Sequence, residues 1–114
     1  MKYQTNCVKI KLKSNSIEKV REWAKVMNER KVEALATLRE ESVILETVFL
    51  DRTNEGDFLI YLMKAESFEK SKKAVENSVH EIDKFHGQFK LETWEGGKKL
   101  ELLVDLERIS EITK

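Results

Sequence analysis

Six consecutive apolar residues near the middle of the chain limit its fold more than any other feature of the sequence. They are residues 58–63, Phe-Leu-Ile-Tyr-Leu-Met, within a segment from Asp57 to Lys64 that is rich in aromatic and aliphatic side chains. An extended strand points successive side chains to opposite faces, so this strand is apolar on both faces. We therefore expect it at the centre of a sheet, with other parts of the protein covering each side.

A second strand precedes the apolar one and forms a hairpin with it. The segment from Val43 to Asp51 has a similar β-branched, aromatic and aliphatic composition. The link between the two strands, residues 52–56, reads Arg-Thr-Asn-Glu-Gly and contains residue types that favour turns.

The N-terminal part of the chain predicts one strand and one long helix. From Cys7 to Lys13 the sequence reads CVKIKLK, and its apolar and lysine side chains alternate as in a half-buried strand. Polar residues 14–16 can cap a helix, and apolar residues at helical spacing predict that it runs from about Ser16 to Glu40. Such a helix would be roughly 37 Å long, whereas an eight-residue strand is roughly 26 Å long. In addition, Lys31 falls in the apolar stripe of the helix. We therefore expect a break near residues 28–31.

The second half of the chain predicts two more helices and a last strand. Helical spacing of apolar residues predicts one helix within residues 68–79 and a short one within residues 82–89, which we expect Gly87 to interrupt. Two glycines at 96–97 predict a turn, and alternating apolar residues from Leu100 to Leu106 predict a fourth strand.

These elements follow the order βαββαβ in a single domain spanning residues 1–114. This order builds a four-stranded antiparallel sheet with both main helices on one face, the ferredoxin-like class of α+β fold. The other face is apolar at its centre and charged at its margins, and is too apolar to face water. We expect two copies to pack sheet against sheet, or the third helix to cover part of this face. The side chains expected there are Cys7, Lys9, Lys11, Glu101, Leu103 and Asp105, with Leu59, Tyr61 and Met63 or their alternates.

The composition narrows the function and the location. With 21 basic and 21 acidic residues, the chain lacks the basic excess of a dedicated nucleic-acid or anionic-membrane binder. One cysteine, Cys7, excludes an internal disulfide. No apolar run is long enough to span a bilayer, and Met1 to Lys13 lacks the apolar core of a signal peptide. We expect a cytoplasmic protein.

The clearest candidates for chemistry are His80, Asp83 and His86. Residues three apart are neighbours on a helix, so Asp83 could orient either imidazole for acid–base work near neutral pH. The histidines are six residues apart, about 9 Å in rise, so one straight helix cannot bring both to one ion and we expect no metal. A structural or solvated role for these side chains is the competing interpretation.

Other side chains carry weaker signals. Cys7 has no assigned histidine partner, and a half-buried residue on an edge strand is the competing interpretation. Tyr61 and Trp94 could contact a ligand or belong to the core. The four glycines form no nucleotide-binding motif, and no Ser-hydrolase motif occurs, so we expect no cofactor. RNA-binding domains share the βαββαβ order, but here Phe58 and Tyr61 point to opposite faces.

Four segments carry a resemblance to a family. EALATL (33–38), ETVFLD (46–51), GDFLIYLMKA (56–65) and HEIDKFH (80–86) resemble a family of small uncharacterised bacterial proteins. That family is similar in organisation to the dimeric α/β-barrel superfamily, which includes antibiotic-biosynthesis-type monooxygenases, haem-degrading enzymes and small ligand-binding or regulatory domains. The resemblance implies a dimer whose two sheets face each other, with a pocket between each sheet and its helices or at the barrel mouth.

We therefore expect a homodimeric domain that binds a small molecule or serves as an interaction module. The alternative is an oxygenase-like enzyme that uses a histidine and Tyr61 in an apolar pocket, so whether the chain is an enzyme stays open. Nucleic acids and membranes are not expected partners. The candidate pocket residues are Glu46, Tyr61, His80, Asp83, His86 and Trp94.

Overall fold

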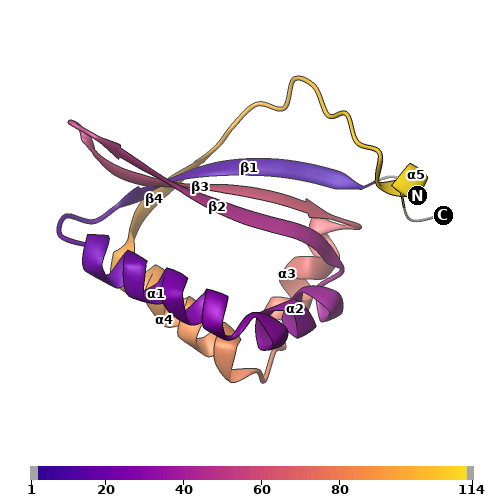
Figure 1. Ribbon diagram of the computed structural model, residues 1–114, viewed down its shortest axis with the longest axis horizontal. Coiled ribbons are helices and arrows are strands. Elements are labelled where there is room, and N and C mark those ends of the chain that lie inside the picture. The colour runs from indigo at the N-terminus through magenta and orange to yellow at the C-terminus, as the bar shows by residue number, and fades with distance from the viewer. Residues whose placement is uncertain (1–2, 113–114) are drawn as a thin grey trace.

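The computed structural model describes residues 3–112, and in it a four-stranded antiparallel sheet packs on a layer of helices (Figure 1). The strands are β1 (Gln4–Leu12), β2 (Val43–Thr53), β3 (Gly56–Ala65) and β4 (Trp94–Lys99). The helices are α1 (Ile17–Glu29), α2 (Lys31–Glu40), α3 (Phe68–Glu76), α4 (Glu81–Thr93) and α5 (Ile109–Ile112). The strand order β2-β3-β1-β4 confirms the ferredoxin-like arrangement that the sequence predicts.

The central position of the apolar strand is confirmed, because β3 pairs with β1 on one side and with β2 on the other. Tyr61 lies opposite Val8 of β1 and Val48 of β2. Side chains paired across strands share a face, and Tyr61 packs in the core with helix residues, so this is the face that the helices cover. Leu59, Tyr61 and Met63 therefore lie beneath the helices, and their alternates, Phe58, Ile60 and Leu62, occupy the open face.

The long first helix breaks where the sequence predicts. α1 ends at Glu29, and the next residue, Arg30, has φ −103° and ψ 37°, outside the α-helical region. α2 then begins at Lys31 and continues beneath the far end of the sheet in a new direction (Figure 1). The break keeps both segments under the sheet instead of letting one helix overhang it.

The predicted interruption at Gly87 is wrong, because α4 runs unbroken from Glu81 to Thr93. A single glycine in a helix costs only about 1 kcal/mol relative to alanine, and packing of the helix offsets it. Ile82 and Phe89 of α4 are buried. Trp23 of α1 stacks on Phe89 with ring centroids 4.5 Å apart, which joins the two helices beneath the sheet. Among residues 3–112, no helix is long and apolar enough to cross a membrane.

The position of the last strand also differs from the prediction. β4 precedes the alternating segment Leu100 to Leu106, and Gly96 and Gly97 lie within the strand, where they pair with β1. A Cβ at Gly97 would lie 2.9 Å from Ile10 Cδ1, so close packing against β1, and not a turn, requires glycine there.

The four longer helices all lie on one side of the sheet, so the expectation that the third helix covers part of the open face is wrong (Figure 1). Residues 101–108 run over the open side as an extended C-terminal segment outside the sheet. Glu101, Leu103 and Asp105, predicted on a fourth strand, lie on this segment.

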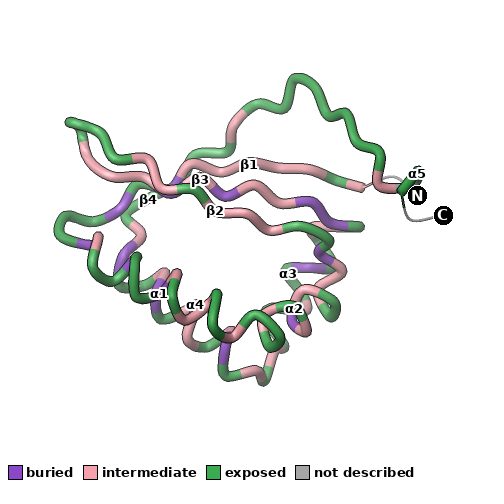
Figure 2. Tube along the Cα trace, in the orientation of Figure 1, coloured by how far each residue is buried: buried purple, intermediate pink, exposed green. Residues whose placement is uncertain are grey.

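One buried lysine anchors the C-terminal segment. Lys64 is 6% exposed, and its Nζ lies 3.0 Å from Asp105 Oδ1 and 3.5 Å from Glu107 Oε2. Figure 2 shows that buried positions follow the sheet and the helices, whereas the C-terminal segment is almost entirely exposed. Its exposed apolar residues are Leu102, Leu103, Val104 and Leu106.

Candidate functional site

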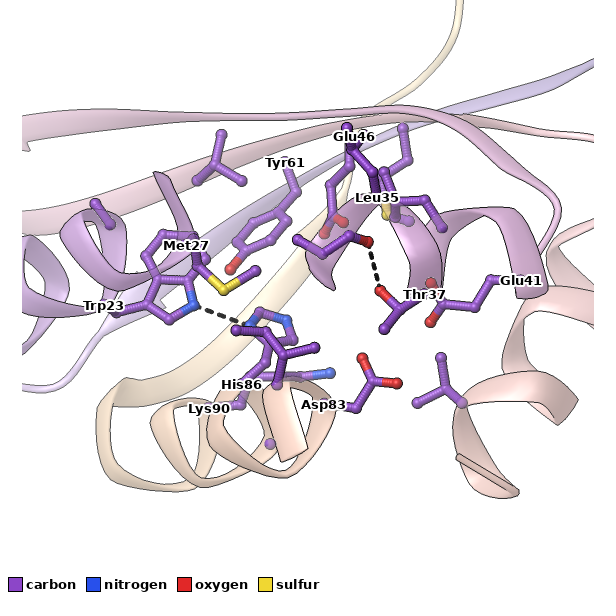
Figure 3. Close-up of a pocket in the computed structure, with 18 of the residues that line it drawn as sticks. Trp23, Met27, Leu35, Thr37, Glu41, Glu46, Tyr61, Asp83, His86 and Lys90 are labelled. Atoms are coloured by element: carbon purple, nitrogen blue, oxygen red, sulfur yellow. Dashed lines mark hydrogen bonds between the residues drawn. The ribbon is translucent and has the colours of Figure 1, made fainter. Parts of the chain in front are cut away.

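A cavity of about 460 Å³ lies between the covered face of the sheet and helices α1, α2 and α4. Its size is within the range of small-molecule sites. Figure 3 shows that its walls differ from one end to the other. The aromatic end contains Trp23, Met27, Tyr61, His86 and Trp94, and the acidic end contains Glu41, Glu46 and Asp83.

Two polar groups at the aromatic end have no hydrogen-bond partner among the described residues, 3–112. Tyr61 is 4% exposed, and its hydroxyl is buried without a donor or acceptor in reach. The indole Nε1 of Trp94 is buried and unpartnered as well, and the two rings meet edge to face with centroids 5.3 Å apart. Burial raises the pKa of the Tyr61 phenol above its ordinary value, and the negative charge of Glu46 adds to this effect. The hydroxyl is therefore protonated at neutral pH and can donate as well as accept.

His86 is held in one tautomer by Trp23. The Trp23 indole Nε1 donates to His86 Nδ1 over 3.0 Å. An indole N–H can only donate, so Nδ1 is the acceptor and the imidazole carries its proton on Nε2. Burial, with a smaller contribution from Lys90, lowers the pKa of His86 to about 4. His86 is therefore neutral at pH 7, and Nε2–H has no acceptor among residues 3–112.

The acidic end gathers carboxylates from three parts of the chain. Glu46 comes from β2 and Asp83 from the first turn of α4, and Glu41 is the C-cap residue directly after α2. Asp83 accepts a hydrogen bond from the Ser78 hydroxyl. In the described part of the chain, no Lys, Arg or His nitrogen lies within 4 Å of the carboxylates of Glu41 and Glu46.

The unpaired carboxylates are harder to ionise than usual. Burial raises the pKa of Glu41 to about 7, and the nearby charges of Asp83, Glu46 and Glu40 add to the effect while Lys90 opposes it. Burial also raises the pKa of Glu46, with Lys90 opposing and Asp83 adding. A cation bound close to Glu41 and Glu46 would favour the ionised form of both carboxylates.

The cavity brings together five of the six candidate pocket residues: Glu46, Tyr61, Asp83, His86 and Trp94. The sixth, His80, precedes the first turn of α4 outside the cavity, and its Nε2 lies 2.8 Å from Glu40 Oε2. The hypothesis that Asp83 orients an imidazole is wrong. Asp83 bonds to Ser78, His86 to Trp23 and His80 to Glu40, so neither imidazole is hydrogen-bonded to Asp83.

The sequence interpretation missed several residues of the site. Trp23 falls at helical spacing between Val20 and Met27, so the apolar stripe of the first helix contained the signal for it. Glu41 had no such signal, because its place depends on where the chain turns between α2 and β2. Within residues 3–112 no group of three or more His, Cys, Asp or Glu side chains is arranged to hold a metal ion.

Two solved structures share this fold. The crystal structure of PA3566 from Pseudomonas aeruginosa is 11% identical, with a TM-score of 0.55 over 88% of this chain and 93% of that chain. A protein from Nitrosomonas europaea, described as a "putative antibiotic biosynthesis monooxygenase", is 12% identical, with a TM-score of 0.55 over 86% of this chain and 85% of that chain. At these identities the likeness shows the fold alone, which is the ferredoxin-like α+β class.

The chain belongs to a family of unknown function (DUF6176), whose model matches residues 3–111. A search of curated proteins gave no match. The resemblance to a family of uncharacterised proteins is therefore confirmed, and so is the ferredoxin-like fold.

Proposed function

We propose that this protein binds a small molecule in the cavity beneath the sheet, and that two copies associate through their open sheet faces. The observation that carries the binding proposal is the Tyr61 hydroxyl, which is buried at the cavity wall without a partner. Leaving such a group unsatisfied costs about 1–3 kcal/mol. A ligand that bonds to it recovers this free energy, so the cavity is suited to a guest with polar groups at defined positions.

Ligand-induced thermal stabilisation tests the binding proposal. A panel of small metabolites should contain members that raise the unfolding temperature, since a ligand at one hundred times its Kd stabilises a protein by about 2.7 kcal/mol. Ala34 is half-buried and lines the cavity from α2, so Ala34→Phe should fill the cavity and abolish the shifts. His80→Ala, outside the cavity, should keep them. Silence across the panel, or shifts that persist in Ala34→Phe, would contradict the proposal.

The dimer proposal rests on apolar surface that the protomer leaves bare. Phe49 on the open face is 58% exposed, and the C-terminal segment that runs over this side adds four exposed apolar residues. Exposed apolar side chains gathered on one side of a protein commonly mark an interface between proteins. The fold neighbours share the same layer arrangement, which leaves one face of the sheet without helices. A monomeric mass at micromolar concentration would contradict this part of the proposal.

A second candidate function is an oxygenase-like enzyme that uses His86 and Tyr61. The observation that favours it is that both side chains line one cavity, with ring centroids 6.4 Å apart. The Nitrosomonas europaea structure is described as a "putative antibiotic biosynthesis monooxygenase", and this description also favours an oxygenase-like function. Oxygen uptake in the presence of a bound ligand tests this function. Uptake should disappear in His86→Ala while binding remains, and a wild-type protein that binds ligands without consuming oxygen would leave binding as the function.

A further inference from the structure

We infer that the ligand carries a protonated amine at one end and a neutral oxygen at the other, joined by a short apolar body. This inference deepens the proposed function and rests on it. The cavity has two chemically different ends, and each end selects one part of such a molecule.

The acidic end selects the cation. Glu41, Glu46 and Asp83 come from separate elements, and Figure 3 shows their carboxylates directed toward the same end of the cavity. Lys31 and Lys90 also line the cavity, but neither ammonium lies within 4 Å of these carboxylates. A ligand ammonium would supply the missing counterion through charge-assisted hydrogen bonds, whereas a ligand carboxylate would be repelled.

The aromatic end selects the neutral oxygen. Tyr61 is only 4% exposed, and its hydroxyl has no hydrogen-bond partner among residues 3–112. Figure 3 shows the hydroxyl directed into the space between the sheet and His86. The unpartnered indole N–H of Trp94 borders the same end. Both groups can donate to a phenol, carbonyl or alcohol oxygen. These two unsatisfied groups are an observation independent of the carboxylates.

Apolar side chains join the two ends. Val48 of β2, Leu35 of α2 and Met63 of β3 line the same cavity. They offer no hydrogen bond to a ligand, so the middle of the ligand is an aliphatic or aromatic group that gains from leaving water.

Three compounds of nearly equal size separate charge from shape. Tyramine carries a phenol and an ammonium, tyrosol replaces the ammonium with a neutral hydroxyl, and 4-hydroxyphenylacetate replaces it with a carboxylate. Isothermal titration of the full chain at pH 8 should give the order tyramine, tyrosol, 4-hydroxyphenylacetate from tightest to weakest. The difference between tyramine and tyrosol should be roughly tenfold, the usual worth of one charge-assisted hydrogen bond.

Matched variants test whether the preference for tyramine over tyrosol arises at the acidic end. Glu46→Gln keeps the size of the side chain and removes its charge, so it should reduce the tyramine preference over tyrosol to about twofold or less. Glu55→Gln in the exposed β2–β3 turn makes the same chemical change outside the cavity and should retain the preference. Tyr61→Phe should weaken tyramine and tyrosol by the same factor, because both share the phenol.

The preference should also depend on pH. The charged groups facing the Glu41 carboxylate are Glu40, Glu46, Asp83 and Lys90, with Lys31 on the same cavity wall. Glu41 takes up a proton as pH falls through about 7, so tyramine should bind several-fold more weakly at pH 6 than at pH 8. Tyrosol has no charge, and its affinity should stay constant over this range.

The outcomes distinguish the inference from the proposed function. If tyrosol binds as tightly as tyramine, or if Glu46→Gln leaves the preference unchanged, the cavity binds ligands but the amine inference fails. If none of the three compounds binds while other panel members stabilise the protein, the inference also fails and the binding function survives. If no compound of any charge binds, both fail.

Discussion

Leu59 and Phe49 lie on neighbouring strands of one sheet, yet Leu59 is 1% exposed on the covered face and Phe49 is 58% exposed on the open face. The covered face is completed by helices of the same chain, which provide both its core and its cavity. The open face also carries apolar side chains, but the protomer places only the C-terminal segment above it. The ion pairs of Lys64 with Asp105 and Glu107 hold this segment in place. On the proposed function, one apolar sheet serves two purposes: its covered face folds the protomer and binds the ligand, and its open face associates with a second copy.

The largest expected effect is on folding at the covered face. Leu59→Ala leaves a cavity in the core and should lower the free energy of unfolding by about 3 kcal/mol. Leu91 of α4 is 73% exposed. The matched change Leu91→Ala should therefore alter the free energy of unfolding by less than about 0.5 kcal/mol. Urea unfolding measures both values. Equal losses would break the distinction between the covered face and the surface.

The next effect is on association at the open face. Phe49→Lys places a charge on the open face, within the proposed interface, so light scattering at micromolar concentration should show the mass fall from a dimer to a monomer. The circular dichroism spectrum should stay unchanged, because Phe49 is not part of the protomer core. Leu91→Lys, the matched control on α4, should remain dimeric. A Phe49→Lys dimer would show that the open face is not the interface.

Alternation of side chains along a strand is a local property and could be predicted, but the sequence left open which face of β3 the helices cover, and Leu59, Tyr61 and Met63 lie on the covered face and not on the open one. Phe58 and Tyr61 point to opposite faces as predicted, and the helix break at Arg30 follows from comparing a helix length with a strand length. The last strand could not be located in this way. The segment from Leu100 to Leu106 alternates more regularly than Trp94–Lys99, but Gly97 of β4 fits against Ile10, a contact visible only in three dimensions.

The candidate site was predictable in part. Tyr61 and His86 could be named because the chain has only two tyrosines and two histidines, and both residues line the cavity. His80 was chosen for the same reason but lies outside, since the start of α4 decides which side chains face the sheet. Glu41 could not be distinguished among 21 acidic residues, because its unusual environment arises from Asp83 and Glu46, which belong to other elements.

A third prediction concerns acid sensitivity on the covered face. The pKa of His86 is lowered from 6.5 to about 4 in the folded protein, so its contribution to stability is present above pH 6.5 and is lost as pH falls toward 4. Between pH 6.5 and pH 5 the loss is about 2 kcal/mol. His86→Gln should flatten this part of the stability profile, as measured by urea unfolding at each pH. An unchanged slope would show that His86 is protonated as easily in the folded chain as in the unfolded one.

The smallest effect is expected at the acidic end, and it has the opposite sign. The pKa of Glu41 is raised from 4.5 to about 7, so ionisation costs stability as pH rises through this range. Glu41→Gln should therefore stabilise the protein at pH 8 and not at pH 4. The gain should be below about 1 kcal/mol, since the carboxylate is only half-buried and solvent screens its charge. Thermal unfolding at the two pH values checks this, and destabilisation at pH 8 would contradict it.

The most direct test of the central claim, that the covered face holds the ligand site, is an NMR titration of the isotope-labelled protein with tyramine. The chain has two tryptophans, and the unpartnered indole N–H of Trp94 should shift strongly, together with the amides of Glu46 and His86. Amides of Phe49 and Ile60 on the open face should stay in place. Shifts confined to the open face, or no shift at the Trp94 indole at saturating tyramine, would contradict the account.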